Sequence, residues 1–117
     1  MDACQAFSAF VKRVLSRDRA ERFSLLANSA KGRHKLLGSL DHDFERAIRA
    51  NAKRGRVNRK VSCYVFHQAT GFGVDFESVA VACDYLNPLD GWLIVASDGS
   101  AGIYRPESNS DATVEFA

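Results

Sequence analysis

Hydrophobic positions in the first part of the chain recur with the spacing of an amphipathic helix. In residues 3–16 they fall at i, i+3, i+4, i+7 and i+8, which places them on one helical face. These residues are Phe7, Phe10, Val11, Val14 and Leu15. The pattern predicts a helix over residues 3–16 that packs this face against a core.

Two further helices are predicted after a break at residues 17–19. Asp18 and Glu21 have the spacing of a capping box, which indicates the start of a second helix, and Gly32 is a plausible stop. A third apolar stripe predicts a helix over residues 34–52. Gly38 weakens its first turns, so the alternative is a break there with Ser39 or Asp41 capping a new helix.

The second part of the chain has the shorter periodicity of strands. Residues 61–67 alternate, and because both faces are largely apolar we expect a central, covered strand. Residues 68–74 contain Gly71 and Gly73 and are predicted to form a loop. Residues 75–86 favour a short helix capped by Asp75, although alternation of Val79, Val81 and Cys83 also fits a strand.

Residues 90–106 carry the clearest structural signal. Strand formers from Trp92 are followed by Asp98-Gly99, the dipeptide typical of a type I′ hairpin turn, and Pro106 ends the returning strand. Residues 112–116 are a candidate last edge strand. The prediction is one α+β domain over residues 1–117, in the order α-α-α-β-(α)-β-β with a possible extra C-terminal edge strand. N-terminal helices would pack on a small, mainly antiparallel sheet.

Charge divides this domain unevenly. The net charge is +2, yet residues 1–60 carry 15 Lys and Arg against 6 Asp and Glu, whereas residues 61–117 carry 1 against 8. The helical half, residues 1–52, is followed by a basic connector, residues 53–60, and then by an acidic sheet half, residues 61–117. The two halves either attract one another in the fold or present charged surfaces to partners.

Several classes of function are disfavoured by what the sequence lacks. No apolar run approaches the roughly 20 residues that span a bilayer, and no signal-peptide pattern begins the chain, so we expect a cytoplasmic protein without a membrane partner. The three cysteines have no CxxC spacing and are expected to be reduced. Asp41, His42 and Asp43 would not converge on a helix, so no metal or cofactor is expected.

A catalytic set is equally hard to find. Cys63 and His67 lie about 13 Å apart on an extended strand, since each residue rises about 3.3 Å. They therefore cannot form a dyad within that strand. A small enzyme built around His67 is the weakest of the alternatives, and no catalytic residue is assigned.

The acidic half favours binding to another, basic protein. Acidic groups interleaved with aromatic residues suit a surface where charge speeds encounter and aromatic side chains supply affinity. The candidate partner-binding residues are Asp75, Glu77, Asp84, Tyr85, Asp98, Tyr104 and Glu107. Trp92 opens an apolar strand and is assigned to the core instead.

The basic connector favours nucleic acid as the alternative partner, because clustered Arg and Lys neutralise phosphates. Its candidate residues are Lys53, Arg54, Arg56, Arg59 and Lys60. No nucleic-acid-binding motif accompanies them. The oligomeric state is left open by the sequence.

The layout resembles that of small cytoplasmic immunity proteins of bacterial toxin systems. The resemblance lies in a helical half containing GSLDHDFERAI, residues 38–48, and a compact half containing DGWLIV, residues 90–95, and IYRPE, residues 103–107. It implies binding and neutralisation of a cognate toxin domain, often a nuclease. It carries no diagnostic motif, so it transfers no functional residue.

Overall fold

Four helices precede a five-stranded sheet in the computed structural model, which describes residues 1–38, 40, 42–48, 53–107 and 112–117. The helices are α1 (Ala3–Val14), α2 (Arg17–Leu26), α3 (Ala30–Gly38) and α4 (His42–Ala47). The strands are β1 (Cys63–His67), β2 (Gly71–Phe76), β3 (Trp92–Ala96), β4 (Gly102–Arg105) and β5 (Val114–Phe116), with α5 (Val79–Leu86) between β2 and β3. The α+β prediction is confirmed.

The sheet has the order β2-β1-β3-β4-β5, and every neighbouring pair is antiparallel. β1 lies between β2 and β3, which confirms the expectation of a central strand. Its side chains alternate between two apolar clusters: Phe66 belongs to one, and Cys63 and Val65 to the other. Each face of the sheet therefore packs against a separate apolar cluster.

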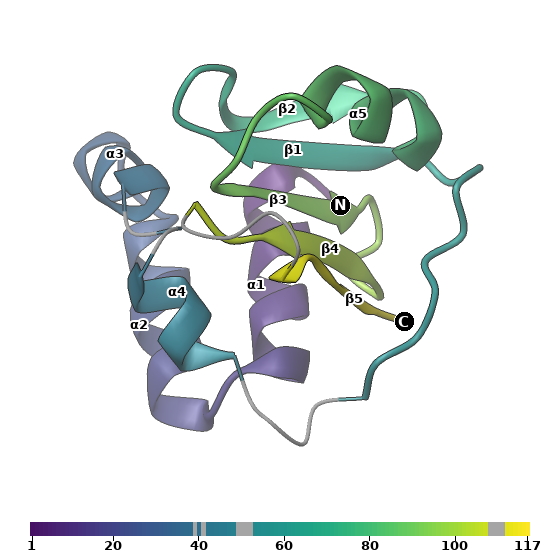
Figure 1. Cartoon of the computed structure of the whole chain (residues 1–117). Helices are drawn as coiled ribbons and strands as arrows, with labels where there is room; N and C mark the ends of the chain where they lie inside the picture. Colours follow the sequence, from purple (N-terminus) through teal and green to yellow (C-terminus); the bar gives the residue numbers. More distant parts are fainter. Residues whose placement is uncertain (39, 41, 49–52, 108–111) are drawn as a thin grey trace.

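The first face is covered by α1 to α4, and we call it the helix face. Phe7 and Phe10 of α1, Phe23 of α2 and Phe44 of α4 are all buried there. The second face, the connector face, is covered by α5 and by residues 53–60, with Val57 packed into the same cluster as Ile94 and Ile103. In Figure 1, α5 lies along the edge formed by β1 and β2.

Helix starts differ from those predicted. The capping box is at α1, where Gln5 N donates to the Asp2 carboxylate and Asp2 N donates to the Gln5 amide oxygen. α2 begins at Arg17 after Ser16, so the predicted start at Asp18 was wrong. Gly32 does not end a helix either, because it lies buried inside α3.

The predicted helix over residues 34–52 is divided in two. α3 ends at Gly38 and α4 covers His42–Ala47, which is the break offered as the alternative. The cost of glycine in a helix interior accounts for an end at this position. Ser39, Asp41 and residues 49–52 lie outside the described residues.

The predicted loop over residues 68–74 was wrong from Gly71 onward, because this residue begins edge strand β2. The register with β1 shifts between Val65 and Phe66, and Gly73 is the extra residue, with φ of +73°. A Cβ at this glycine would lie 2.3 Å from that of Ala3. The glycine that suggested a loop instead permits a β-bulge against α1.

The short helix at residues 75–86 is confirmed in part. α5 starts later, at Val79, and its N-cap is Ser78, whose hydroxyl accepts from Val81 N at 3.2 Å. Asp75 lies instead in β2, opposite Tyr64. Asp75 is therefore not the cap.

The hairpin of β3 and β4 is confirmed, but its turn is not type I′. Gly99 has φ of +75°, whereas no non-glycine residue of the described chain has a positive φ. Type I′ needs positive φ at both central residues, so Asp98 does not fit it. Instead Gly99 N donates to Ala96 O at 2.8 Å, and Ala96 N donates to Ala101 O at 2.9 Å. β5 confirms the expected C-terminal edge strand.

Candidate functional site

Three exposed apolar side chains lie on the neighbouring elements α5 and β2. They are Val74 on β2 and Val81 and Tyr85 on α5, with exposed fractions of 37%, 42% and 51%. Glu77 and Asp84 are exposed around them, and Asp75 is exposed on the same strand as Val74. We call the set of Val74, Glu77, Val81, Asp84 and Tyr85 the acidic–aromatic surface.

Helix and strand periodicity explain how this surface forms. Val79, Ala82 and Leu86 of α5 face the core. Val81 and Tyr85 are four residues apart and share a different, outer face, with Asp84 three residues from Val81. The Tyr85 ring stands 5.6 Å from the Phe76 ring, which joins the helix to the edge strand.

Asp75 occupies a different position from the other carboxylates. It pairs with Tyr64, whereas Val74 pairs with Val65. Since successive strand residues point to opposite faces, Asp75 points away from the α5 side of β2. It borders the surface, while Asp84 lies on α5 itself and Glu77 in the connection that leads from β2 to α5.

The carboxylates of this surface lack ionic partners within the described chain. The two ion pairs found there are Arg17–Glu21 and Arg59–Glu115. Arg105, the single cation of the acidic half, donates instead to Asn87 O at 2.9 Å and to Leu89 O at 3.2 Å. The surface therefore retains its negative charge.

The remaining predicted partner residues lie elsewhere. Asp98 is in the β3–β4 turn, at one end of the hairpin, and Glu107 follows β4 at the other end. Tyr104 is buried, with 1% of its surface exposed, and its hydroxyl donates to Leu40 O. Its ring packs 5.0 Å from that of Phe44, so Tyr104 is a core residue and cannot reach a partner.

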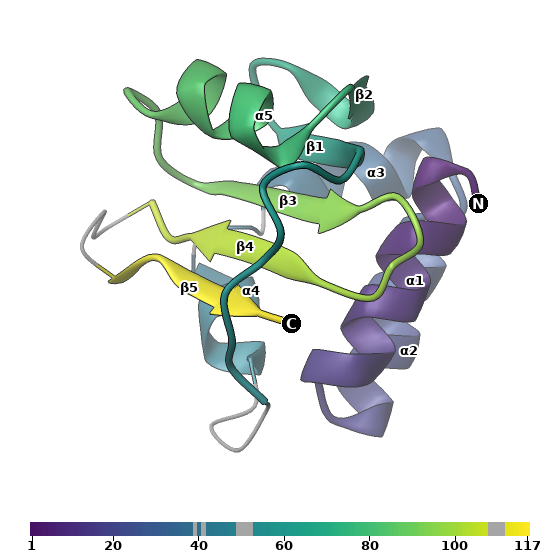
Figure 2. The ribbon, with the colours of Figure 1, turned by 90° about the vertical axis from the view of Figure 1, so that its right-hand side faces the viewer.

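The basic connector crosses the connector face instead of leaving the fold. Figure 2 shows it passing in front of β3, β4 and β5. Gly55 N donates to Glu115 O at 3.3 Å, and Val57 N donates to the Glu115 carboxylate at 2.9 Å. The connector is therefore anchored along β5.

Arg59 completes this anchor. Its guanidinium binds both carboxylate oxygens of Glu115, at 2.6 and 3.0 Å, and donates to Val57 O at 2.9 Å. The hydrogen bonds from Arg59 hold the pKa of Glu115 below its usual value of 4.5. Arg59 is therefore committed to the fold, while Lys53, Arg54, Arg56 and Lys60 remain exposed.

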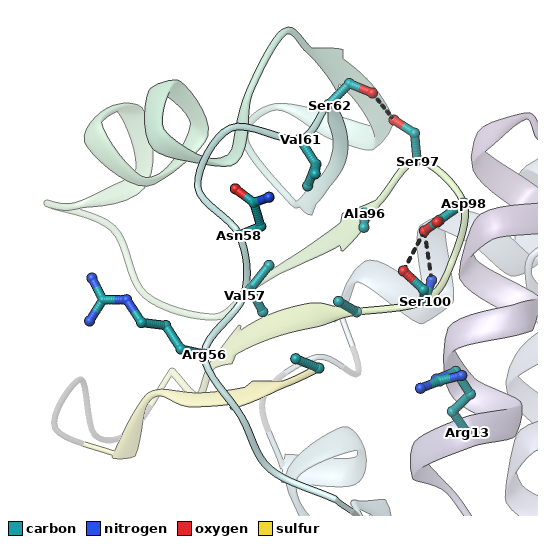
Figure 3. Close-up of a pocket in the computed structure, with 12 residues that line it drawn as sticks. Arg13, Arg56, Val57, Asn58, Val61, Ser62, Ala96, Ser97, Asp98 and Ser100 are labelled. Carbon is teal, nitrogen blue, oxygen red and sulfur yellow. Dashed lines mark hydrogen bonds between the residues drawn. The ribbon is translucent and has the colours of Figure 1, made fainter.

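A pocket opens beside the connector, with a volume of about 480 Å³ (Figure 3). Its walls come from the connector, from the β3–β4 turn and from Arg13 of α1. Ser62 and Ser97 share a hydrogen bond of 2.8 Å at its upper edge. Sequence reasoning missed this pocket because its walls are distant in the chain and share no motif.

His67 and Cys63, the residues considered for a catalytic pair, are engaged or buried within the fold. His67 Nδ1 accepts from Ala69 N at 3.1 Å, and its Nε2 lies 3.0 Å from Asp90 O, so both ring nitrogens are engaged. Burial raises the pKa of the Cys63 thiol to about 12, which keeps it protonated at neutral pH. The described residues contain no group of three or more His, Cys, Asp or Glu placed to hold a metal ion.

Comparisons with protein-family models, with curated proteins and with solved structures found no match. No helix in the described part of the chain has the length and apolar character needed to cross a membrane.

Proposed function

We propose that the protein is a non-enzymatic protein-binding module, and that its acidic–aromatic surface binds a basic partner. One observation carries the proposal: Val74, Val81 and Tyr85 are exposed on the neighbouring elements β2 and α5, and the carboxylates exposed on or beside these elements have no ion-pair partner in the described chain. Singly exposed apolar residues are normal in proteins, but a cluster rimmed by charge marks a contact surface.

The chemistry of the surface indicates how it would work. Tyr85 is the aromatic anchor, a residue type that supplies much of the binding energy at interfaces. Its ring is held in place against Phe76, so little freedom is lost on binding. Glu77 and Asp84 at the rim would attract a basic partner and raise the association rate.

We infer a toxin domain as the class of partner to test first, because the layout resembles that of small immunity proteins. A nuclease toxin has a basic surface that binds phosphates, and this surface is complementary to the acidic–aromatic surface. On this reading the protein would bind the toxin domain and block it. The product of the adjacent reading frame is the first probe to test.

The test is calorimetric titration with that product, or with a partner identified by cross-linking in the source cells. Replacing Glu77 and Asp84 together by Lys is expected to weaken binding at least tenfold, mainly through a slower association rate. Asp18→Lys, an exposed reversal on α2, is the matched control and should have little effect. Unchanged binding by the double variant would refute the assignment.

Nucleic acid remains the second candidate partner, favoured by the exposure of Lys53, Arg54 and Arg56 along the anchored connector. Its test replaces these three cations by Gln and leaves Arg59 intact, because loss of Arg59 would release the connector. Binding of a labelled duplex should weaken, and the slope of log K against log salt should fall by about 0.9 per lost contact. An unchanged slope would exclude the connector.

A further inference from the structure

The pocket beside the connector has the size and lining of a small-ligand site. Its volume of about 480 Å³ lies within the range of about 300–1,000 Å³ typical of such sites. Apolar side chains from both walls line it, together with a few polar groups. The apolar residues are Val57, Val61, Ala96 and Ala101.

Hydroxyl groups at the edge of the pocket retain hydrogen-bonding capacity. Ser62 and Ser97 bond to each other, and only one of their two protons is used in that bond. The other hydroxyl can donate to a ligand. Asn58, from the connector, adds the two donors of its amide group, whose oxygen already accepts from Lys60 N at 2.9 Å.

Two arginines stand at opposite sides of the pocket. In Figure 3, Arg13 extends from α1 toward the turn, whereas the guanidinium of Arg56 points away from the cavity and reaches a ligand only after a rotamer change. Neither guanidinium has an ion pair within 4 Å in the described chain. A second cavity of about 210 Å³ also touches Arg13 and Ser100 and brings Lys53 to the same region.

Asp98 places a negative charge on the same wall. Its carboxylate accepts from Ser100 N at 2.9 Å and from Ser100 Oγ at 2.6 Å, and these bonds lower its pKa. An ionised Asp98 repels a ligand that is anionic throughout. It suits a ligand whose anionic group reaches Arg13 and whose hydroxyl or amino group lies next to the carboxylate.

We propose that this pocket binds a phosphorylated small molecule of mononucleotide size. The phosphate would lie between Arg13 and Lys53, since both cations border the adjoining cavities. The flat, weakly polar ring of the ligand would rest against the partly buried Val61 and Ala101. Asp98 and the serine pair would meet the sugar hydroxyls. This site is separate from the acidic–aromatic surface and does not depend on the proposed function.

The test follows amide chemical shifts and calorimetric heats of the whole chain with adenosine 5′-monophosphate, adenosine, inorganic phosphate and a 12-mer oligonucleotide. The monophosphate is expected to bind at least about tenfold more tightly than adenosine or phosphate alone, since a charged hydrogen bond adds this much. Shifts should centre on Ser62, Ser97 and Ala101.

Two variants locate the site. Ala101→Leu fills the pocket, and Arg13→Gln removes its exposed cation; each should weaken binding of the monophosphate about tenfold or more. Lys31→Gln, an exposed change on α3, is the matched control and should bind as the native chain does. If Ala101→Leu does not fold, Arg13→Gln decides.

Four results would overturn the proposal. The first is that the monophosphate does not bind at millimolar concentration, and the second is that adenosine or phosphate binds as tightly as the monophosphate. The third is that Arg13→Gln binds the monophosphate with native affinity. The fourth is that the oligonucleotide binds and the monophosphate does not. The last result would assign the cations to a nucleic-acid backbone instead of a pocket ligand.

Discussion

The two faces of the sheet are covered in different ways. The helix face is closed by four helices, and buried aromatic side chains dominate its cluster, namely Phe7, Phe10, Phe23, Phe44, Phe66, Tyr104 and Phe116. The connector face has Trp92 as the one aromatic residue of its buried set, and its cover is one short helix and an irregular segment held by polar contacts. The helix face is therefore held mainly by buried side chains, whereas the connector face depends on local anchors.

We expect the helix face to contribute most of the stability, and both proposed binding sites lie at the connector face. The acidic–aromatic surface lies on α5 and the edge strand beside it, and the pocket beside the connector opens between residues 53–60 and the hairpin turn. Both border the connector face. Surfaces that bind partners are commonly formed by loops and short elements placed on a rigid scaffold, and the helix face supplies that scaffold here.

The largest loss of stability is expected on the helix face. Phe44 is fully buried, and its ring packs 5.4 Å from that of Phe23 and 5.0 Å from that of Tyr104. Phe44→Ala should lower the free energy of unfolding by about 3–5 kcal/mol, measured by urea denaturation. Val81→Ala on the other face is the control, with a change within about 0.5 kcal/mol. Equal losses of unfolding free energy in Phe44→Ala and Val81→Ala would contradict the difference between the two faces.

The anchor of the connector is expected to contribute less. Glu115→Gln removes a bidentate pair whose side chains are 33% and 27% exposed, and should cost about 1–2 kcal/mol. Because folding lowers the pKa of Glu115, this contribution is complete above the ordinary value of 4.5 and is lost as the pH falls through the lowered pKa.

Urea denaturation of both chains at several pH values measures this effect. The difference in stability between native chain and variant should be constant near neutral pH and shrink below pH 4.5. Glu21→Gln, in the exposed Arg17–Glu21 pair, is the control and should change stability by about 0–0.5 kcal/mol. A difference that persists unchanged at pH 3 would contradict the role of the carboxylate charge.

The N-caps of α5 and α2 are expected to differ in their contribution to stability, by up to about 1 kcal/mol. Ser78 accepts from Val81 N and caps α5, whereas Ser16 precedes α2 without a side-chain cap bond. Ser78→Ala should therefore cost about 1 kcal/mol, and Ser16→Ala clearly less, in thermal or urea unfolding. Equal costs would mean that α5 does not depend on its cap.

A small change in stability is expected for Tyr85→Ala. The side chain is 51% exposed, and its ring contact is with half-buried Phe76. Its removal should lower the unfolding free energy by less than about 1 kcal/mol, as surface substitutions usually do. A loss similar to that of Phe44→Ala would make Tyr85 a core residue and remove it from the proposed interface.

The sequence predicts the α+β fold where periodicity is strong. The stripe of α1 and the β3–β4 hairpin follow directly from side-chain spacing, because 3.6- and 2-residue periods define which face is buried. Glycine was the main source of error. Gly73 permits a bulge in a strand because Ala3, distant in the chain, lies against it, and Gly32 lies inside a helix, where a Cβ would meet Leu26 O and Ser29 Oγ.

The candidate sites are predicted less well. Asp84 and Tyr85 are both exposed on α5, whose opposite face is buried, and Glu77 is exposed just before the helix. Tyr104 looked identical in sequence but is buried against Phe44, and Arg59 looked like its cationic neighbours but pairs with Glu115. No local pattern separates Tyr104 from Tyr85, or Arg59 from the other cations of the connector. The carbonyl that accepts from Tyr104 and the carboxylate that pairs with Arg59 each lie more than 50 residues away in the chain.

The affinity of a basic partner for Tyr85→Ala, compared with that for Leu25→Ala, tests the proposed binding surface most directly. Both residues are exposed and apolar, but Leu25 lies on α2, at 70% exposure, away from the acidic–aromatic surface. Calorimetry should show binding weakened at least about 30-fold by Tyr85→Ala, the effect of losing an aromatic hot spot of about 2 kcal/mol, and unchanged by Leu25→Ala. Native affinity in the Tyr85 variant, or a loss of affinity in the Leu25 variant alone, would contradict the assignment of the binding surface.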